Sequence, residues 1–106
     1  SLAAVKEVLD HISLHYQENL TVSELSGLSN YSEYYFMKLF KQYTGKTVAS
    51  YLNDFRLEKA KVLLLHSDRS ITEIALDVGF NNTSYFIKKF QQANLVSPHK
   101  YRKNMS

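Results

Sequence analysis

The sequence of 106 residues contains no cysteine, no tryptophan, only one proline and only three glycines. Without cysteine it can form no disulfide, thiolate metal site or cysteine nucleophile, and this composition suits a reducing compartment such as the cytoplasm, where we expect the protein to be. Few proline and glycine residues interrupt the chain, which favours a mainly helical structure. No apolar run approaches the ~20 residues of a membrane span and no signal peptide is visible, so we expect no membrane partner.

Acidic residues are missing from one end of the chain. Residues 82–106 contain no acid but several bases: Lys88, Lys89, Lys100, Arg102 and Lys103. Residues 1–36 show the reverse, because Lys6 is the only base beside several acids. This asymmetry predicts an anionic partner for the carboxy-terminal part, although a solvated charged tail would give the same pattern. Since the chain begins with Ser1 and not with methionine, we also expect a fragment of a longer protein.

Helical periodicity and capping residues predict an all-α fold of about seven helices. The apolar spacing first predicts a helix over residues 2–17. The segments "TVSE" at 21–24 and "SITE" at 70–73 are capping boxes, and each begins a short helix. The remaining helices are expected to begin at Ser32, Thr47, Asn82 or Thr83, and Ser97-Pro98. The helix from Thr47 is long, ends near His66, and has these expected buried residues: Tyr51, Leu52, Phe55, Ala60, Leu63 and Leu64.

The hexapeptides "YFMKLF" at 35–40 and "YFIKKF" at 85–90 indicate an internal repeat. The capping boxes are 49 positions apart, from Thr21 to Ser70, whereas the hexapeptides are 50 apart. The second copy therefore has one extra residue, in its turn, and Tyr51 and Tyr101 continue the second offset. Amphipathic patterning alone could match by chance, but the agreement of caps, turns and core spacing favours duplication.

Each copy reads as a short capped helix, a turn and a longer amphipathic helix, which is the order of a helix-turn-helix unit. The small residues Ser26 and Ala75 allow the two helices to cross closely, and Asn30 and Gly79 suit the turn. The second helix of such a unit can lie in the major groove of DNA. Its outward face then carries the base-reading and phosphate-binding side chains, which are Glu33, Tyr34, Met37, Lys38, Lys41 and Gln42 in the first copy and Asn82, Thr83, Ser84, Ile87, Lys88 and Gln91 in the second.

Other classes of protein compete with this interpretation, since each polar face alone could be the solvated side of an ordinary helix. An enzyme is disfavoured, because the sequence contains no glycine-rich phosphate loop, paired carboxylates or nucleophile–base pattern. His11 and His15 have the spacing of zinc ligands, but the glutamate of a zinc hydrolase motif is missing and no third ligand is evident, so we expect no metal and no cofactor. A helical module that docks a protein or an anionic membrane is the second alternative, with an exposed patch of Tyr31, Tyr34 and Met37.

Residues 55–103, "FRLEKAKVLLLHSDRSITEIALDVGFNNTSYFIKKFQQANLVSPHKYRK", resemble the carboxy-terminal signature of AraC-type (AraC/XylS) transcription regulators. The positions that carry this resemblance are Arg56, Leu57, Ala60, Leu63, Leu64, Ile71, Ile74, Ala75, Gly79, Phe80, Ser84, Tyr85, Phe86, Phe90, Pro98, Tyr101 and Arg102. In the first half, the matching positions are Ser32, Phe36, Phe40, Lys41, Gly45, Tyr51 and Leu52. The resemblance covers nearly the whole chain. It implies two helix-turn-helix subdomains, residues 1–46 and 67–106, joined by a long linker helix over residues 47–66, and binding of double-stranded DNA as a transcription regulator.

The resemblance also implies roles for individual residues. In the first recognition helix it places Tyr34, Met37 and Lys38 toward bases and Lys41 toward phosphate. In the second it places Thr83, Ser84, Ile87 and Lys88 toward bases, and Lys89 and the "PHKYR" segment near the DNA backbone. The expected backbone contacts are Ser32, Thr47, His99, Lys100 and Arg102. The expected protein partners are RNA polymerase and an amino-terminal sensory or dimerisation domain of the same protein.

Two residues depart from the family pattern. Leu95 stands where the family usually has glycine, so we expect the link to the last helix to avoid a left-handed turn or to reshape it. Ser26 replaces a usual alanine and adds a hydroxyl group to the helix crossing. Neither position is an expected DNA contact, so these departures concern local geometry and not function.

Overall fold

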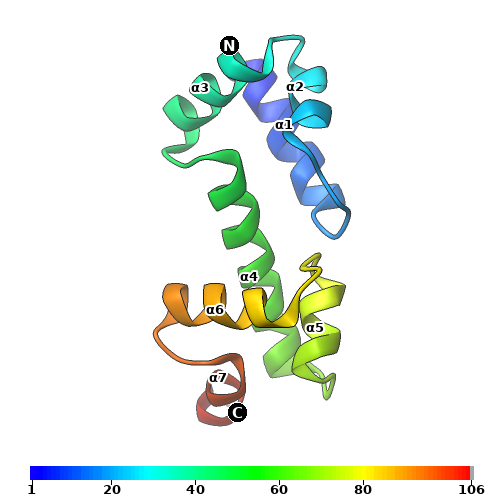
Figure 1. The fold of residues 1–106 in the computed structure, drawn as a ribbon, viewed down its shortest axis with the longest axis vertical. Coiled ribbons are helices and arrows are strands. Elements are labelled where there is room, and N and C mark those ends of the chain that lie inside the picture. Colours follow the sequence, from blue (N-terminus) through cyan, green and yellow to red (C-terminus); the bar gives the residue numbers. More distant parts are fainter. Residues whose placement is uncertain (106) are drawn as a thin grey trace. The chain divides into compact units, whose positions relative to one another are not determined.

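The computed structural model describes residues 1–105, which fold into seven α-helices without a strand (Figure 1). The helices are α1 (Leu2–His15), α2 (Val22–Ser29), α3 (Glu33–Thr44), α4 (Val48–His66), α5 (Ile71–Asp77), α6 (Thr83–Asn94) and α7 (Pro98–Met105). The all-α prediction is therefore confirmed, although α1 ends two residues earlier than expected. Within residues 1–105, no helix combines the length and the apolar character needed to cross a membrane.

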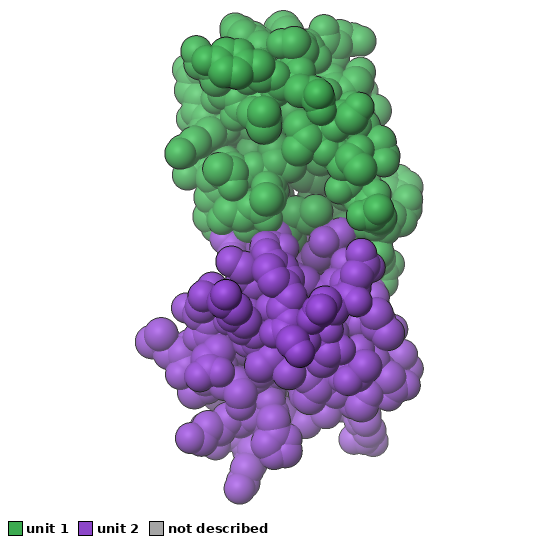
Figure 2. Space-filling view, viewed as in Figure 1, with its two compact units in different colours: residues 1–52 green, residues 53–106 purple. Residues whose placement is uncertain are grey.

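The helices belong to two compact units, which Figure 2 colours separately. The first unit, residues 1–52, contains α1, α2, α3 and the start of α4, and the second unit begins at residue 53 and contains the rest of α4 with α5, α6 and α7. The helix α4 is continuous over 19 residues and contributes to both. Each unit has its own buried phenylalanines, which are Phe36 and Phe40 in the first and Phe80, Phe86 and Phe90 in the second.

The aromatic core of one unit is repeated in the other. The ring centroids of Phe36 and Phe40 are 5.8 Å apart, and Tyr51 meets Phe40 edge-on at 5.4 Å. Fifty residues later, Phe86 and Phe90 are 5.9 Å apart and Tyr101 meets Phe90 at 5.5 Å, again near the edge-on angle. Edge-on aromatic pairs contribute about 0.5–1.5 kcal/mol beyond their burial. The same packing solution at the same spacing supports the predicted duplication.

The helix starts repeat as well, because each is capped by a short polar side chain that accepts a hydrogen bond from the third helical N–H. In α2 and α5 the acceptors are the Thr21 and Ser70 hydroxyls, both at 3.1 Å. In α3 and α6 they are the Ser32 hydroxyl at 3.2 Å and the side-chain carbonyl of Asn82 at 2.9 Å, so Asn82 and not Thr83 is the N-cap of α6. In α4 and α7 they are the Thr47 and Ser97 hydroxyls, both at 3.1 Å.

The two predicted capping boxes differ in one contact. At Ser70 the box is complete, since the Glu73 carboxylate accepts from the Ser70 backbone N–H at 2.9 Å. At Thr21 the Glu24 carboxylate instead accepts from the Thr21 hydroxyl at 3.3 Å. The hydrogen bond to Ser70 is the largest cause of the lowered pKa of Glu73, and the charge of Arg69 lowers this pKa further.

The buried side of α4 differs from the prediction. Three of the six expected residues are buried, namely Leu52, Ala60 and Leu64, and three are only half-buried, namely Tyr51, Phe55 and Leu63. Arg56 and Leu57 are buried instead. The reason is that α4 serves two cores in turn, so no single apolar stripe continues along it. The Arg56 guanidinium carbon lies 5.9 Å from the centre of the Phe80 ring, and burial lowers the pKa of Arg56.

Leu95 does adopt the left-handed backbone, so the expectation that the chain avoids this turn was wrong. Its φ of 65° matches the equivalent Gly45, whose φ is 79°. In both, the backbone N–H donates at 2.8 Å to the carbonyl four residues back, Gln91 for Leu95 and Lys41 for Gly45. A β-carbon in this region costs roughly 1–2 kcal/mol. The second unit therefore retains the duplicated turn despite the strain, while the Leu95 side chain is 85% exposed.

Replacing Leu95 with glycine should raise the free energy of unfolding by about 0.5–1 kcal/mol, because relief of the backbone strain outweighs the extra freedom of glycine in the unfolded chain. Urea unfolding followed by circular dichroism measures this difference. The matched control is Gly45→Ala, whose added β-carbon would meet no atom within 4 Å and would therefore report strain alone. Gly45→Ala should destabilise. A Leu95→Gly variant less stable than the parent would contradict the strain argument.

Candidate nucleic-acid interface

Two helix pairs have the helix-turn-helix arrangement, α2 with α3 and α5 with α6. The small residues Ser26 and Ala75, which were predicted at the two helix crossings, are both buried. The extra hydroxyl of Ser26 causes no conflict, because it donates to the Ser23 carbonyl at 3.1 Å. The chain turns through Asn30, with φ 63°, in the first unit and through Gly79, with φ 108°, in the second. Both turns thus use the residues that tolerate left-handed geometry.

The buried phenylalanines of α3 leave its other side in solvent. All six residues expected on that side are exposed, namely Glu33, Tyr34, Met37, Lys38, Lys41 and Gln42. The Lys38 ammonium lies 5.6 Å from the centre of the Tyr34 ring, within cation–π range. Tyr34 and Met37 are 71% and 45% exposed, which is a large apolar area to leave on a helix surface. This face therefore combines basic groups with apolar contact surface.

A shallow hollow of about 530 Å³ adjoins this face of α3. It is lined by Tyr34, Met37, Lys38, Lys41, Gln42, Thr47 and Val48. The apolar groups of Tyr34, Met37 and Val48 provide its non-polar surface, and two lysines contribute positive charge with no acid among the lining residues. Five expected DNA contacts and the expected backbone contact Thr47 thus surround one depression.

The outward side of α6 is arranged differently. Of its expected residues, four are exposed and three are half-buried; the exposed ones are Asn82, Ser84, Lys88 and Gln91, and the half-buried ones are Thr83, Ile87 and Lys89. The Lys89 ammonium lies 5.5 Å from the centre of the Tyr85 ring. Leu39, which occupies the position of Lys89 in the first unit, is buried. The helix α6 contains no acid, and its only charged residues are the adjacent lysines Lys88 and Lys89.

The residues expected at the DNA backbone have two kinds of environment. His99 and Lys100 are exposed at the start of α7, whereas the Ser32 and Thr47 hydroxyls cap α3 and α4. Arg102 is held within the second unit: its Nε donates to the Leu64 carbonyl at 2.9 Å and an Nη donates to the Ser67 carbonyl at 3.2 Å. These bonds join α7 to the carboxyl end of α4. No spacing in the sequence indicates such a contact, because its partners are more than thirty positions away.

Sequence reasoning also missed a polar contact between α4 and α6. The Asn53 amide on α4 donates to the Tyr85 hydroxyl at 3.1 Å. Tyr85 was named only as part of the repeated hexapeptide and of the family resemblance, with no role of its own, and it is 45% exposed. Its match with Tyr35 in the first copy is a signal of the repeat, but a sequence does not show which hydroxyl meets which amide.

The two acidic residues of α5 are paired with Arg69. The Arg69 guanidinium donates through Nε and Nη to the two carboxylate oxygens of Asp77, with the second distance 3.0 Å, and lies 3.7 Å from the Glu73 carboxylate. The hydrogen bond and charge of Asp77 raise the pKa of Arg69. This pairing offsets negative charge in the helix that precedes the basic face of α6.

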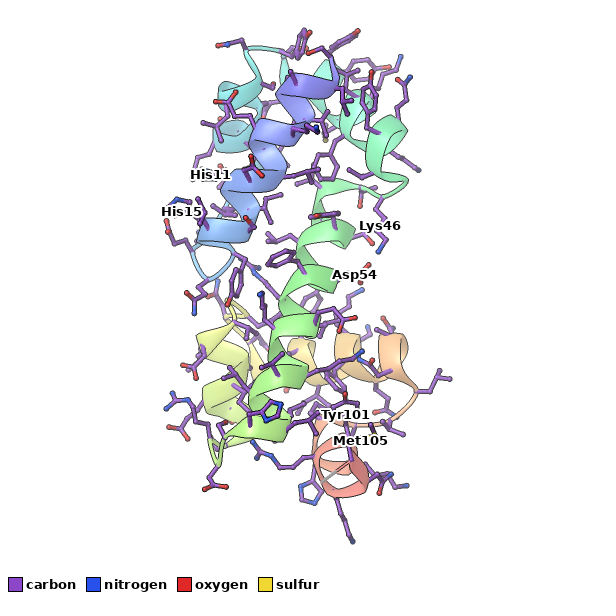
Figure 3. The ribbon with its side chains drawn as sticks, turned by 180° about the vertical axis from the view of Figure 1, so that it is seen from behind. His11, His15, Lys46, Asp54, Tyr101 and Met105 are labelled. Carbon is purple, nitrogen blue, oxygen red and sulfur yellow. The ribbon has the colours of Figure 1, made fainter. Side chains whose placement is uncertain are left out.

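The histidines of α1 are close to each other but do not form part of a larger cluster of ligands. Figure 3 labels His11 and His15, whose rings are stacked at 4.4 Å, and His15 Nδ1 lies 2.5 Å from the Glu18 carboxylate. Over residues 1–105, no group of three or more histidine, aspartate or glutamate side chains is gathered as a metal site would require.

Comparison with known proteins agrees with this geometry. The model of a helix-turn-helix domain family matches residues 25–104. The Regulatory protein PocR of Salmonella typhimurium is 39% identical over 102 residues, which are 96% of this chain and 34% of PocR. The chain spans about a third of the length of the first curated relatives that it matches.

Solved structures extend the comparison to the fold. The C-terminal domain of AraT, a response regulator from Geobacillus stearothermophilus, has a TM-score of 0.90 and 33% identity, over 95% of this chain and 84% of that one. The DNA-binding domain of the global transcriptional factor AdpA, solved with a target DNA, has a TM-score of 0.91 and 28% identity, over 94% of this chain and 90% of that one. The chain therefore belongs to the family of AraC-type helix-turn-helix domains, which are DNA-binding domains of transcription regulators and not enzymes.

Proposed function

We propose that this chain binds double-stranded DNA sequence-specifically through two recognition helices, α3 and α6, and is the DNA-reading part of a bacterial transcription regulator. One observation carries the proposal: α3 and α6 each bury two phenylalanines and leave the opposite face of the helix polar and basic. Such a face matches the acceptors on base edges and the phosphates beside them. The relative AdpA, whose DNA-binding domain was solved with its target DNA, supports the same use here.

The exposed residues take different roles in this proposal. On α3, Tyr34, Met37 and Lys38 face bases and Lys41 faces a phosphate, with Glu33 and Gln42 at the two ends of the contact. On α6, Thr83, Ser84, Ile87 and Lys88 face bases, with Asn82 and Gln91 at the ends and Lys89 beside the DNA backbone. The other backbone contacts are Ser32, Thr47, His99 and Lys100, while Arg102 holds α7 in place for them.

The length of α4 sets the spacing of the two contacts in this proposal. A helix of 19 residues is roughly 28 Å long. One turn of duplex DNA is about 34 Å, so a linker helix over residues 47–66 could carry subdomains 1–46 and 67–106 to successive major grooves. One chain would then bind an asymmetric site with two half-contacts about a turn apart, and bend the DNA between them.

The wider role follows from the regulators that the chain resembles. A sensory or dimerisation domain of the same protein would control the DNA-binding part, and RNA polymerase would be its partner at the promoter. Because DNA is the proposed ligand, we infer that the protein works in the bacterial cytoplasm.

Selection of bound duplexes from a random pool, followed by footprinting and a salt titration, tests the proposal. We expect enrichment of two short motifs about one turn apart and an affinity that falls steeply as salt rises, because bound phosphates release counterions. Absence of sequence-selective protection at moderate salt would refute DNA reading. Binding to a protein or to anionic vesicles in its place would favour the helical docking module.

Loss of Lys88 should change base preference as well as affinity. Lys88→Ala should weaken binding by about 1–3 kcal/mol, roughly five- to 150-fold, and relax the preference at a single base pair, because lysine can donate to guanine acceptors. Competition binding against single-base variants of the selected site measures both effects. Lys100→Ala is the control and should weaken all sequences equally. An equal loss on all sequences for Lys88→Ala would make Lys88 a phosphate contact.

The hollow beside α3 predicts that one thymine methyl contributes to recognition. The methyl is the main apolar group that base pairs present in the major groove, and Met37 is the exposed aliphatic residue of the lining, beside the ring of Tyr34. Replacing one thymine of the selected site by uracil should cost about 0.8 kcal/mol, roughly fourfold, measured by fluorescence anisotropy. Met37→Ala should abolish this difference, and the control Ile87→Ala should keep it. Equal binding of every thymine-to-uracil variant by the parent protein would exclude the contact.

A further inference from the structure

A polar cluster of three residues lies on one flank of α6, outside the face assigned to bases. Tyr85 is in the first turn of the helix, where its backbone N–H donates to the Asn82 side chain at 2.9 Å. Its ring lies 6.1 Å from the Phe80 ring, and its hydroxyl reaches Asn53 on α4 at 3.1 Å. Although it is held from two sides, Tyr85 stays 45% exposed. A tyrosine fixed in place at the surface has an orientation that a ligand can use without an ordering cost.

The hydrogen bond from Asn53 leaves the Tyr85 hydroxyl with a proton to donate. A phenol oxygen can accept one bond and donate another, and here the Asn53 amide N–H occupies its acceptor side. The O–H can therefore still donate to another acceptor, such as one bound at this exposed residue. A phosphate oxygen is such an acceptor, and hydrogen bonds to charged oxygens are stronger than those between neutral groups.

Lys89 adds a positive charge at the same place. Its ammonium lies 5.5 Å from the centre of the Tyr85 ring, one helical turn further along α6, and α6 has no acid to compete for it. The ring attracts the ammonium and so limits its freedom. The cluster thus presents a neutral donor and a cation side by side, which is the pair of groups that recognises a phosphodiester.

Helix geometry directs this pair to the side of the proposed base contacts. Successive residues are about 100° apart on a helix, so Tyr85 and Lys89 are turned by that angle from Ser84 and Lys88. A helix in the major groove has base edges in front and a phosphate strand at each side. We propose that the Tyr85 hydroxyl and the Lys89 ammonium bind one phosphate of the DNA strand beside α6, and that Asn53 is a positioning residue that orients the Tyr85 hydroxyl. This inference rests on the proposed function.

The first unit lacks this cluster. Its equivalent tyrosine, Tyr35, packs its ring 5.0 Å from the Tyr31 ring, and the position of Lys89 is taken by the buried Leu39. The proposed phosphate site is therefore a feature of the second unit alone. Tyr35, which is 48% exposed, becomes a matched control for Tyr85.

Substitution of Tyr85 by phenylalanine tests the hydroxyl, because it keeps the ring and its packing. Tyr85→Phe should weaken DNA binding about three- to tenfold, by the same factor on every selected sequence, since a phosphate contact carries no base information. Tyr35→Phe should bind as the parent does. Fluorescence anisotropy measures affinity, and a thermal melt of each variant checks that both remain folded.

A second experiment identifies the phosphate directly. In a series of duplexes, one phosphate at a time is replaced by a neutral methylphosphonate. At one position the methylphosphonate should weaken DNA binding by the parent protein, so that the parent and Tyr85→Phe bind this duplex with equal affinity. At every other position the parent should still bind more tightly than Tyr85→Phe. Lys89→Met should lower the slope of log affinity against log salt by about 1. Asn53→Ala should lose part of the affinity that Tyr85→Phe loses. On the duplex with the identified methylphosphonate, Asn53→Ala should bind as tightly as the parent.

Several outcomes would overturn the phosphate site. The first is that Tyr85→Phe binds DNA as tightly as the parent, and the second is that its loss of affinity is confined to one base pair. The third is that its loss of affinity persists at every methylphosphonate position, which would indicate a purely structural hydroxyl. In each case selective binding by the parent protein would leave the proposed function intact. Failure of the parent to select any sequence would instead remove the proposed function itself.

Discussion

The interface depends on a pair of phenylalanines four residues apart in each recognition helix. Phe36 and Phe40 in α3, and Phe86 and Phe90 in α6, are fully buried, and a tyrosine from a later helix closes each pair edge-on. Because the two rings occupy one side of the helix, the rotation of that helix about its axis is fixed. The exposed residues of α3 and α6 therefore have their positions as a consequence of this rotation.

Much of the structure could be predicted from the sequence because its determinants act over a few neighbouring residues. Helix starts were assigned correctly because a capping side chain acts over three residues, within one stretch of sequence, as at Ser32 and Ser70. The exposed face of α3 followed from the spacing of its phenylalanines. Both patterns are local in the sequence, and each occurs in both copies of the repeat.

What could not be predicted depends on contacts between distant residues. The hydrogen bonds of Arg102 are an example, because the sequence does not show that the Leu64 and Ser67 carbonyls lie within its reach. The buried side of α4 was only partly correct, because one helix serves two cores. Leu95 shows a different limit: a leucine disfavours the left-handed backbone, yet Leu95 adopts it at a cost in strain.

The caps also have an evolutionary consequence. Lys88 and Met37 neither cap a helix nor fill a core, so they are free to vary and a new target sequence can be acquired without loss of stability. Asn82 lacks this freedom, since its side-chain carbonyl caps α6. At that position only the few residue types that cap a helix are tolerated, and adaptation to a new operator is confined to short polar side chains. The duplicated scaffold therefore separates residues that can vary from those, such as Asn82, that also cap a helix.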